Sequence, residues 1–166
     1  MRVYLPATTA SLHALLKTGT LADPPLTGFA VTPGLREHYL DDDIEELEYA
    51  ASAQAARASL RLLAADPTAA RRRMVVAADV EDSAIVVRDD LEIGVIRVQV
   101  PVVLAWCASV HCDDADAEAT VAQAAELVDA ADLGDAEAED KVDDASGFEL
   151  CWYATQEIGQ LLAELG

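Results

Sequence analysis

Hydrophobic and polar positions recur with two different periods along this chain, and each period predicts a different kind of element. A spacing of three or four residues marks the segment Ile44–Ala65, in which Leu47 and Ala51 share one face. Asp43 precedes this segment as a capping residue, and Asp66-Pro67 ends it. The pattern therefore predicts a long helix that packs one face against a core.

Alternation with period two predicts a strand that starts at Val95. Ile96 and Val98 point to one side of this strand, and the polar residues between them point to the other. Pro101 interrupts the hydrogen-bond ladder, because proline has no amide proton to donate. The stretch Val95–Asp114 is therefore predicted to form two strands, the second over Cys107–Cys112.

The other expected elements alternate between strands, helices and loops. They are a strand at Arg2–Pro6, a helix from Thr8 or Thr9 to Gly19, a loop at Thr20–Val31, a short helix at Gly34–Leu40, strands at Met74–Val80 and Ile85–Val87, a helix at Ala115–Ala131, an acidic mobile loop at 133–147, a strand at Phe148–Tyr153 and a final helix from Thr155. Two strand–helix–strand crossovers then bracket a central hairpin. This order predicts one α+β domain over residues 1–166, a two-layer sandwich with a mixed β-sheet and helices on one face, in a ferredoxin-like or related βαββαβ arrangement.

The charge of the chain limits the surfaces that it can meet. With 31 acidic and 11 basic residues its net charge is −20. A field of this sign repels phosphate groups, which argues against direct binding to nucleic acid or to an anionic membrane. Three interpretations remain: acidic residues that serve solubility, a basic protein partner (such as a nucleic-acid-binding protein held by an acidic mimic), or a salt-adapted proteome.

The N-terminal segment and the cysteines bear on the compartment. The first residues lack the long apolar core of a signal peptide, and no run approaches the ~18 apolar residues of a membrane span. Cys107, Cys112 and Cys151 are odd in number and include no Cys-x-x-Cys pair. We therefore expect a cytoplasmic protein with free thiols and no contact with a membrane.

The densest group of reactive side chains follows the second strand, at His111, Asp113 and Asp114. Together with Asp79, which ends another predicted strand, these residues form a candidate site for a divalent metal ion. The simpler interpretation is that Asp113 and Asp114 cap the following helix while His111 packs at the edge of the sheet. Neighbours along a strand face opposite ways, so His111 and Cys112 are not expected to act as a base–nucleophile pair.

Other motifs add little catalytic chemistry. The basic cluster Arg71–Arg73 could bind an anion or, more simply, balance the acids around it. The chain lacks a phosphate-binding glycine loop, a Gly-x-Ser-x-Gly elbow and a nucleotide fingerprint. No cofactor is therefore expected, apart from the divalent metal ion of the alternative hypothesis.

Five segments of the chain are distinctive: RVYLPAT, LEYAASAQAARASLRLL, MVVAADV, ASVHCDD and LCWYAT. Together they resemble a family of small actinobacterial proteins known only as a domain of unknown function. The resemblance covers most of the chain apart from the acidic stretch 133–147. Family members often carry valine at the position of Cys112, which implies that this thiol is not essential. The resemblance implies a cytoplasmic protein and no particular activity.

Two hypotheses follow from the sequence. The first is a non-catalytic binding or regulatory protein that acts on a basic protein partner through its acidic surface. The alternative is a metal-dependent enzyme, such as a hydrolase, with a site at the strand-to-helix junction 111–114 and Asp79.

Overall fold

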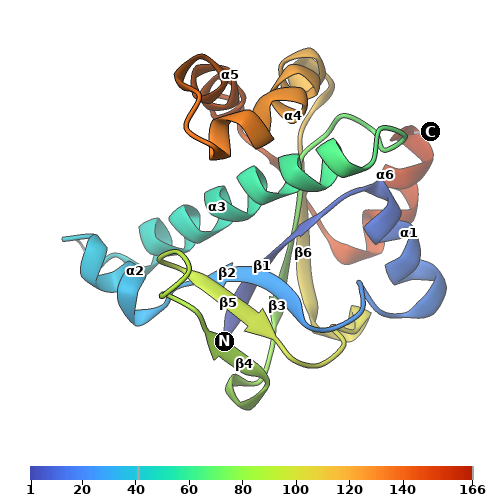
Figure 1. The fold of residues 1–166 in the computed structure, drawn as a ribbon. Helices are drawn as coiled ribbons and strands as arrows, with labels where there is room; N and C mark the ends of the chain where they lie inside the picture. Colours follow the sequence, from blue (N-terminus) through green and yellow to red (C-terminus); the bar gives the residue numbers. More distant parts are fainter. Residues whose placement is uncertain (41, 166) are drawn as a thin grey trace.

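The computed structural model describes residues 1–40 and 42–165 and is built around one antiparallel β-sheet (Figure 1). The seven strands lie in the order β4-β5-β2-β1-β3-β6-β7. They are β1 (Arg2–Ala7), β2 (Leu26–Ala30), β3 (Met74–Asp79), β4 (Ile85–Val87), β5 (Val95–Val98), β6 (Cys107–Cys112) and β7 (Cys151–Tyr153). The predicted α+β class is confirmed. The prediction of a mixed sheet is wrong, because every pair of neighbouring strands in these described residues runs antiparallel.

Helices cover both faces of the sheet. They are α1 (Thr9–Thr18), α2 (Pro33–His38), α3 (Ile44–Ala65), α4 (Glu118–Asp132), α5 (Ala136–Ser146) and α6 (Ile158–Leu165). Helix α3 packs on one face and α1 with α6 on the other, while α4 and α5 lie beside the later turns of α3 (Figure 1). The expected two-layer sandwich with helices on one face is thus corrected to three layers. The right-handed crossover rule that favoured a single face applies to parallel strands, and here the strands on either side of α1 are antiparallel neighbours.

The alternation of side chains along β1 shows how the two cores arise. Val3 and Leu5 are buried in the core that contains α1 and α6, whereas Tyr4 is buried against α3. Successive residues of a strand point to opposite faces, so one short strand supplies both cores. The odd-numbered residues of β1 point toward α1 and α6 and therefore cannot contribute to a site on the α3 side.

Helix α3 spans the residues predicted for it, and its ends are held by specific contacts. At its start the Asp43 side chain accepts a hydrogen bond from the Glu45 amide at 3.0 Å. Near its end the buried Ser59 hydroxyl donates to the Ala7 carbonyl at 2.8 Å and accepts from the Met74 amide at 3.1 Å. These bonds join α3 to the ends of β1 and β3, so the helix is fixed in register over the sheet.

The acidic segment 133–147 forms α5 and not the expected loop. Asp135 caps the helix by accepting a hydrogen bond from the Ala138 amide at 3.0 Å. Ala138 and Val142 lie one turn apart on its buried face, and Arg57 of α3 donates two hydrogen bonds to Glu139, at 2.8 and 2.9 Å. The low content of bulky residues suggested a loop, but small side chains suffice where two helices pack closely.

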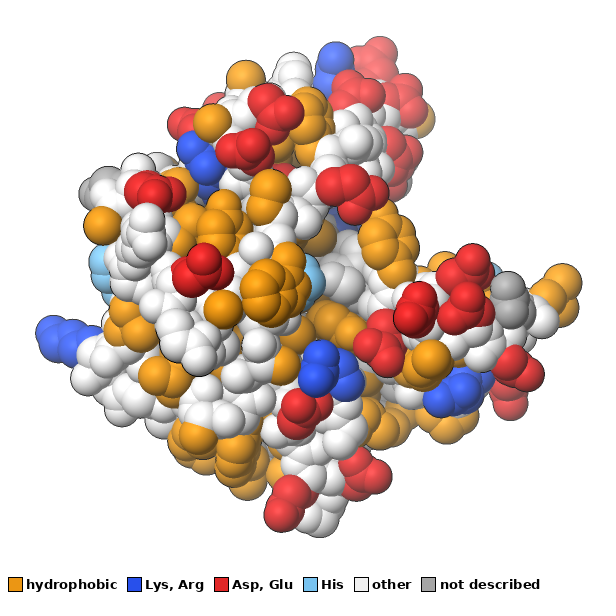
Figure 2. Space-filling view, turned by 180° about the vertical axis from the view of Figure 1, so that it is seen from behind, with side chains coloured by type: hydrophobic (Ala, Val, Ile, Leu, Met, Phe, Trp, Pro, Cys, Tyr) orange, Lys and Arg blue, Asp and Glu red, His pale blue; other side chains and the backbone are white. Residues whose placement is uncertain are grey.

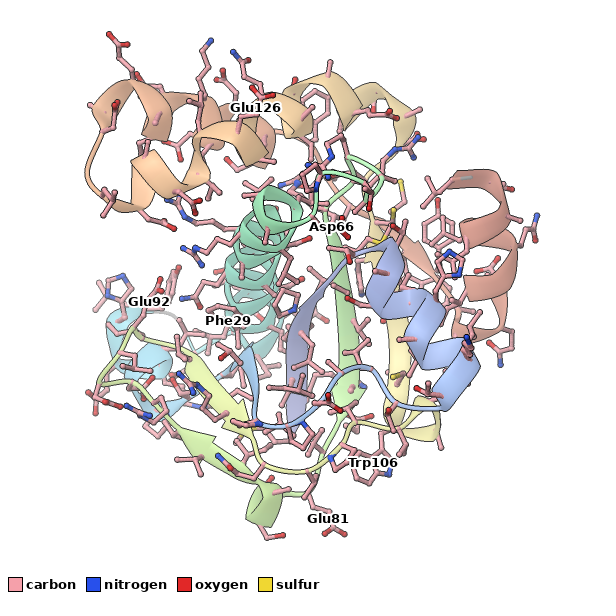
Figure 3. All side chains as sticks on the ribbon, turned by 45° about the vertical axis from the view of Figure 1, so that its right-hand side comes forward. Phe29, Asp66, Glu81, Glu92, Trp106 and Glu126 are labelled. Atoms are coloured by element: carbon pink, nitrogen blue, oxygen red, sulfur yellow. The ribbon has the colours of Figure 1, made fainter. Side chains whose placement is uncertain are left out.

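Strand β2 occupies part of the segment predicted as the loop Thr20–Val31. It lies between β1 and β5 near the middle of the sheet, and its Phe29 is buried beneath α3 (Figure 3). Gly28 faces the opposite core, where an added Cβ would come within 2.7 Å of the Leu5 side chain. The glycine that suggested a loop is thus a strand residue placed where the backbone approaches its neighbour closely.

The stretch Val95–Asp114 divides as predicted. Its first part is β5 and its second is β6, with a 3-10 turn at Leu104–Trp106 between them. Within the ranges 1–40 and 42–165, no helix has both the length and the apolar character needed to cross a membrane.

Candidate functional site

Asp113, the central member of the proposed metal site, forms a buried ion pair. Its carboxylate accepts hydrogen bonds from Arg73 at Nε (2.8 Å), Nη2 (2.7 Å) and the backbone amide (2.8 Å). Asp113 is 1% exposed and Arg73 is 4% exposed, so the pair is screened from water. Arg73 also donates to the Phe148 carbonyl at 3.0 Å, which links the pair to the segment that precedes β7.

The three other predicted ligands lie in separate surroundings. Asp114 is exposed and caps the 3-10 turn after β6 by accepting a hydrogen bond from the Ala115 amide at 2.8 Å. Asp79 pairs with Arg2 at 2.8 Å, and this hydrogen bond lowers the pKa of Asp79. Asp79 lies at the end of β3, whereas Asp113 lies beside the start of that strand. At roughly 3.4 Å per residue, the two ends of β3 are ~17 Å apart.

His111 belongs to the α3 side of the sheet. Its Nε2 lies 3.0 Å from the Ser109 hydroxyl, and burial, with a smaller effect of the Arg2 charge, lowers its pKa. The four predicted ligands therefore do not converge. Among residues 1–40 and 42–165 no group of three or more histidine, cysteine, aspartate or glutamate side chains is arranged to hold a metal ion. The physical reason is that Asp113 and Asp79 are each engaged by an arginine, and Asp114 by a backbone amide.

Cys112 lies on the opposite face from His111. It is buried in the core on the α1 and α6 side, and burial raises the pKa of its thiol to about 12. A thiol with so high a pKa supplies almost no thiolate at neutral pH. The basic cluster before β3 is also used internally: besides Arg73, Arg72 pairs with Glu118 at 3.1 Å, and Arg71 donates to the carbonyls of Leu63 and Asp66 near the end of α3.

A hollow of about 480 Å³ lies between the first half of α3 and the β6–β7 end of the sheet. We call this hollow the α3 groove. Its lining includes Tyr4, Glu45, Glu48, Tyr49, His111, Glu149 and Trp152, together with Arg73, whose guanidinium is paired with Asp113. A second hollow of about 830 Å³ adjoins it between α3 and α5 and shares Tyr49 with it. The face drawn in Figure 2 is hollowed near its middle, with acidic side chains along the rim.

The α3 groove gathers aromatic rings in a chain that has few of them. Two of the four tyrosines line it, together with one of the two tryptophans and one of the two phenylalanines. Trp152 is 62% exposed and Tyr49 is 59% exposed, although both present large apolar surfaces. Exposed aromatic surface around a hollow is typical of a site that a ligand covers.

Carboxylates stand among these rings, and in the described residues none of them forms an ion pair with the nearby Arg73, which is held by Asp113. Glu48 accepts a hydrogen bond from the Tyr4 hydroxyl at 2.8 Å, and Glu149 accepts one from the Tyr49 hydroxyl at 2.9 Å. Burial and the bond to Glu48 raise the pKa of Tyr4, so its proton stays on the phenol oxygen. In the part of the chain that the structure describes, no ion pair reaches Glu45, Glu48 or Glu149. The groove is therefore an acidic, aromatic cleft.

The comparisons with known proteins concern the whole chain. A model for a family of unknown function, DUF6912, matches residues 1–162. The chain belongs to the DUF6912 family. The match includes the acidic segment that forms α5, which the resemblance seen in the sequence left out. No curated protein and no solved structure matches this DUF6912 protein significantly.

The sequence pattern indicated His111 but not the other residues of the α3 groove. Glu48 and Tyr49 lie in the predicted long helix, where an acidic first half is explained by the helix dipole alone. Trp152 was placed on a predicted strand beside a cysteine, without a role. One signal in the sequence could have indicated the groove, namely the aromatic residue Trp152 in a short predicted strand. This signal becomes informative only when the position of α3 beside the strand is known.

Proposed function

We propose that this DUF6912 protein is a non-catalytic binding protein that takes a basic segment of a partner protein into the α3 groove. The observation that carries the proposal is the set of unpaired carboxylates, Glu45, Glu48 and Glu149, beside the exposed rings of Tyr49 and Trp152. A lysine or arginine side chain fits both features, because it pairs with carboxylates and stacks on aromatic faces. The three cysteines are free, which agrees with a place in the reducing cytoplasm.

The arrangement of the groove favours binding over catalysis. His111 lines it, and the Nε2 of His111 forms a hydrogen bond with the Ser109 hydroxyl. Ser109 is 5% exposed, so the pair is not presented to a substrate as a nucleophile and base. Acidic rims also accelerate the approach of basic partners, which suits a regulatory contact.

Isothermal titration with a nine-residue peptide of alternating arginine and threonine tests the proposal. We expect binding that weakens steeply as salt is raised, because the groove carboxylates are screened. The double variant Glu48→Gln/Glu149→Gln should weaken binding about tenfold, since two partly exposed ion pairs contribute on the order of 0.5–1 kcal/mol each.

The matched control is Glu126→Gln/Glu137→Gln, which makes the same change in net charge on α4 and α5. Both residues are exposed and lie outside the α3 groove, and Glu126 stands on α4 well away from β2 and Phe29 (Figure 3). This variant should keep binding within twofold of the parent. No binding by the parent protein would refute the proposal. An equal loss in both variants would show that total charge and not the groove governs the interaction.

A further inference from the structure

The free edge of the sheet at β7 borders the α3 groove. Strand β7 is the last in the order of the sheet and pairs on one side with β6, with His111 opposite Trp152. In the described part of the chain, no hydrogen bond other than those to β6 involves the backbone of Cys151, Trp152 or Tyr153. A row of backbone donors and acceptors at such an edge is a template for another strand.

We propose that the partner segment binds as an extended strand along β7 and so adds an eighth strand to the sheet. This inference rests on the proposed function and adds to it the conformation of the ligand. Natural sheets protect their edges with very short edge strands, lysine, proline or a covering element. Strand β7 is short, with three residues, but it contains neither lysine nor proline, and its middle residue is the 62% exposed Trp152.

The pleat of an added strand explains why the edge and the α3 groove act together. Strand neighbours lie about 4.8 Å apart, and alternate side chains of the added strand would point to the α3 side. There they would lie beside Trp152, within reach of Glu149 and the carboxylates of α3. The segment we infer is therefore extended, with basic residues at every second position.

Charge distinguishes this occupant from a second copy of the chain. Pairing β7 with β7 of another copy would bring together two molecules that each carry a net charge of −20. Like charges of this size oppose association, whereas a basic segment is attracted to the same edge. A basic strand is therefore the occupant that fits both the edge and its surroundings.

The experiment compares three peptides with the same alternating arginine and threonine sequence. One is unmodified, one is N-methylated at every arginine, and one is N-methylated at every threonine. In an added strand, one set of amides faces β7 and the other faces solvent. We expect one methylated peptide to bind about tenfold or more weakly, because it loses its inter-strand hydrogen bonds, and the other to bind within threefold of the parent.

Each outcome decides between the two proposals. If both methylated peptides bind as the parent does, strand addition is overturned while binding in the α3 groove stands. If the unmodified peptide fails to bind, both proposals fail. Sedimentation of the protein without peptide tests whether a second copy occupies the edge. If the protein forms a dimer at micromolar concentration and Trp152→Lys converts it to a monomer, the edge belongs to a second copy and the inference is overturned.

Discussion

Replacing Asp113 by asparagine should destabilise the protein by about 3–5 kcal/mol, because it leaves a buried guanidinium without its counter-charge. The asparagine side chain has nearly the same shape and keeps one oxygen that can accept from the Arg73 amide. The change therefore removes charge with little loss of packing. Arg73 is 4% exposed, so water cannot replace the missing carboxylate without opening the structure.

The geometry of the pair supports the upper part of this range. The carboxylate of Asp113 accepts three hydrogen bonds of 2.7 to 2.8 Å, and all three come from Arg73. The double variant Arg73→Met/Asp113→Asn should be more stable than Asp113→Asn alone by more than ~1 kcal/mol, since it removes the unpaired charge as well. The double variant should still be less stable than the parent protein, in part because it lacks the hydrogen bond from Arg73 to the Phe148 carbonyl.

Urea denaturation followed by circular dichroism measures the effect as a shift of the midpoint at constant slope. The control is Asp114→Asn, the next residue, which makes the same change in charge at an exposed capping position and should cost at most about 1 kcal/mol. For a chain of this size, 3–5 kcal/mol also lowers the melting temperature by on the order of 10 °C. A loss below 1 kcal/mol for Asp113→Asn, or equal losses at 113 and 114, would refute the reasoning.

Three further predictions concern other parts of the molecule. The lowered pKa of His111 means that the folded protein resists its protonation, so stability should be retained above about pH 6.5 and fall as pH drops through the folded pKa. The urea midpoint, measured from pH 5 to 8, should therefore rise with pH, and this rise should be smaller in His111→Gln. Gly28→Ala should cost about 1–3 kcal/mol in the same assay, because its Cβ would meet Leu5 within 2.7 Å, whereas Gly159→Ala, with open space around it, should not destabilise. Asp89→Ala should cost a similar ~1–3 kcal/mol, since three donors, the Thr32 hydroxyl and the amides at 34 and 94, would lose their acceptor; a loss under 0.5 kcal/mol would contradict this.

Elements defined by local periodicity could be predicted from the sequence. Helix α3 and strand β6 have the bounds expected for them. The apolar stripe of α3 is visible within a short window of the sequence. The division of Val95–Asp114 near Pro101 was predictable for the same reason. The opposite faces of His111 and Cys112 follow from the period of a strand alone.

The elements that were missed depend on contacts distant in the sequence. Strand β2 follows two prolines and contains Gly28, and both features favour a loop when the chain is considered locally. It forms a strand because β1 and β5 pair with its two edges. Helix α5 depends in the same way on Arg57, which lies 82 residues before Glu139.

The four predicted ligands lie apart for a reason that the sequence does not show, because it does not give the partners of a charged side chain. Asp113 and Asp114 are chemically identical neighbours, and both were expected to cap a helix or to bind metal. One is turned into the interior toward Arg73, 40 residues away, and the other caps an exposed turn. Only the register of β3 against β6 brings that arginine and that aspartate together.

The distribution of paired and unpaired acids gives the net charge a structural meaning. Where the described chain offers a cation, the acid beside it serves the fold: Arg73 holds β6, Arg57 holds α5, and Arg2 holds the end of β3. The groove carboxylates belong to none of these pairs, although they lie beside exposed aromatic rings. Solubility alone requires acids on the surface but gives no reason to place them around an aromatic hollow at a free sheet edge. This coincidence of charge, rings and edge, and not the value of −20, is what favours a basic strand as the ligand.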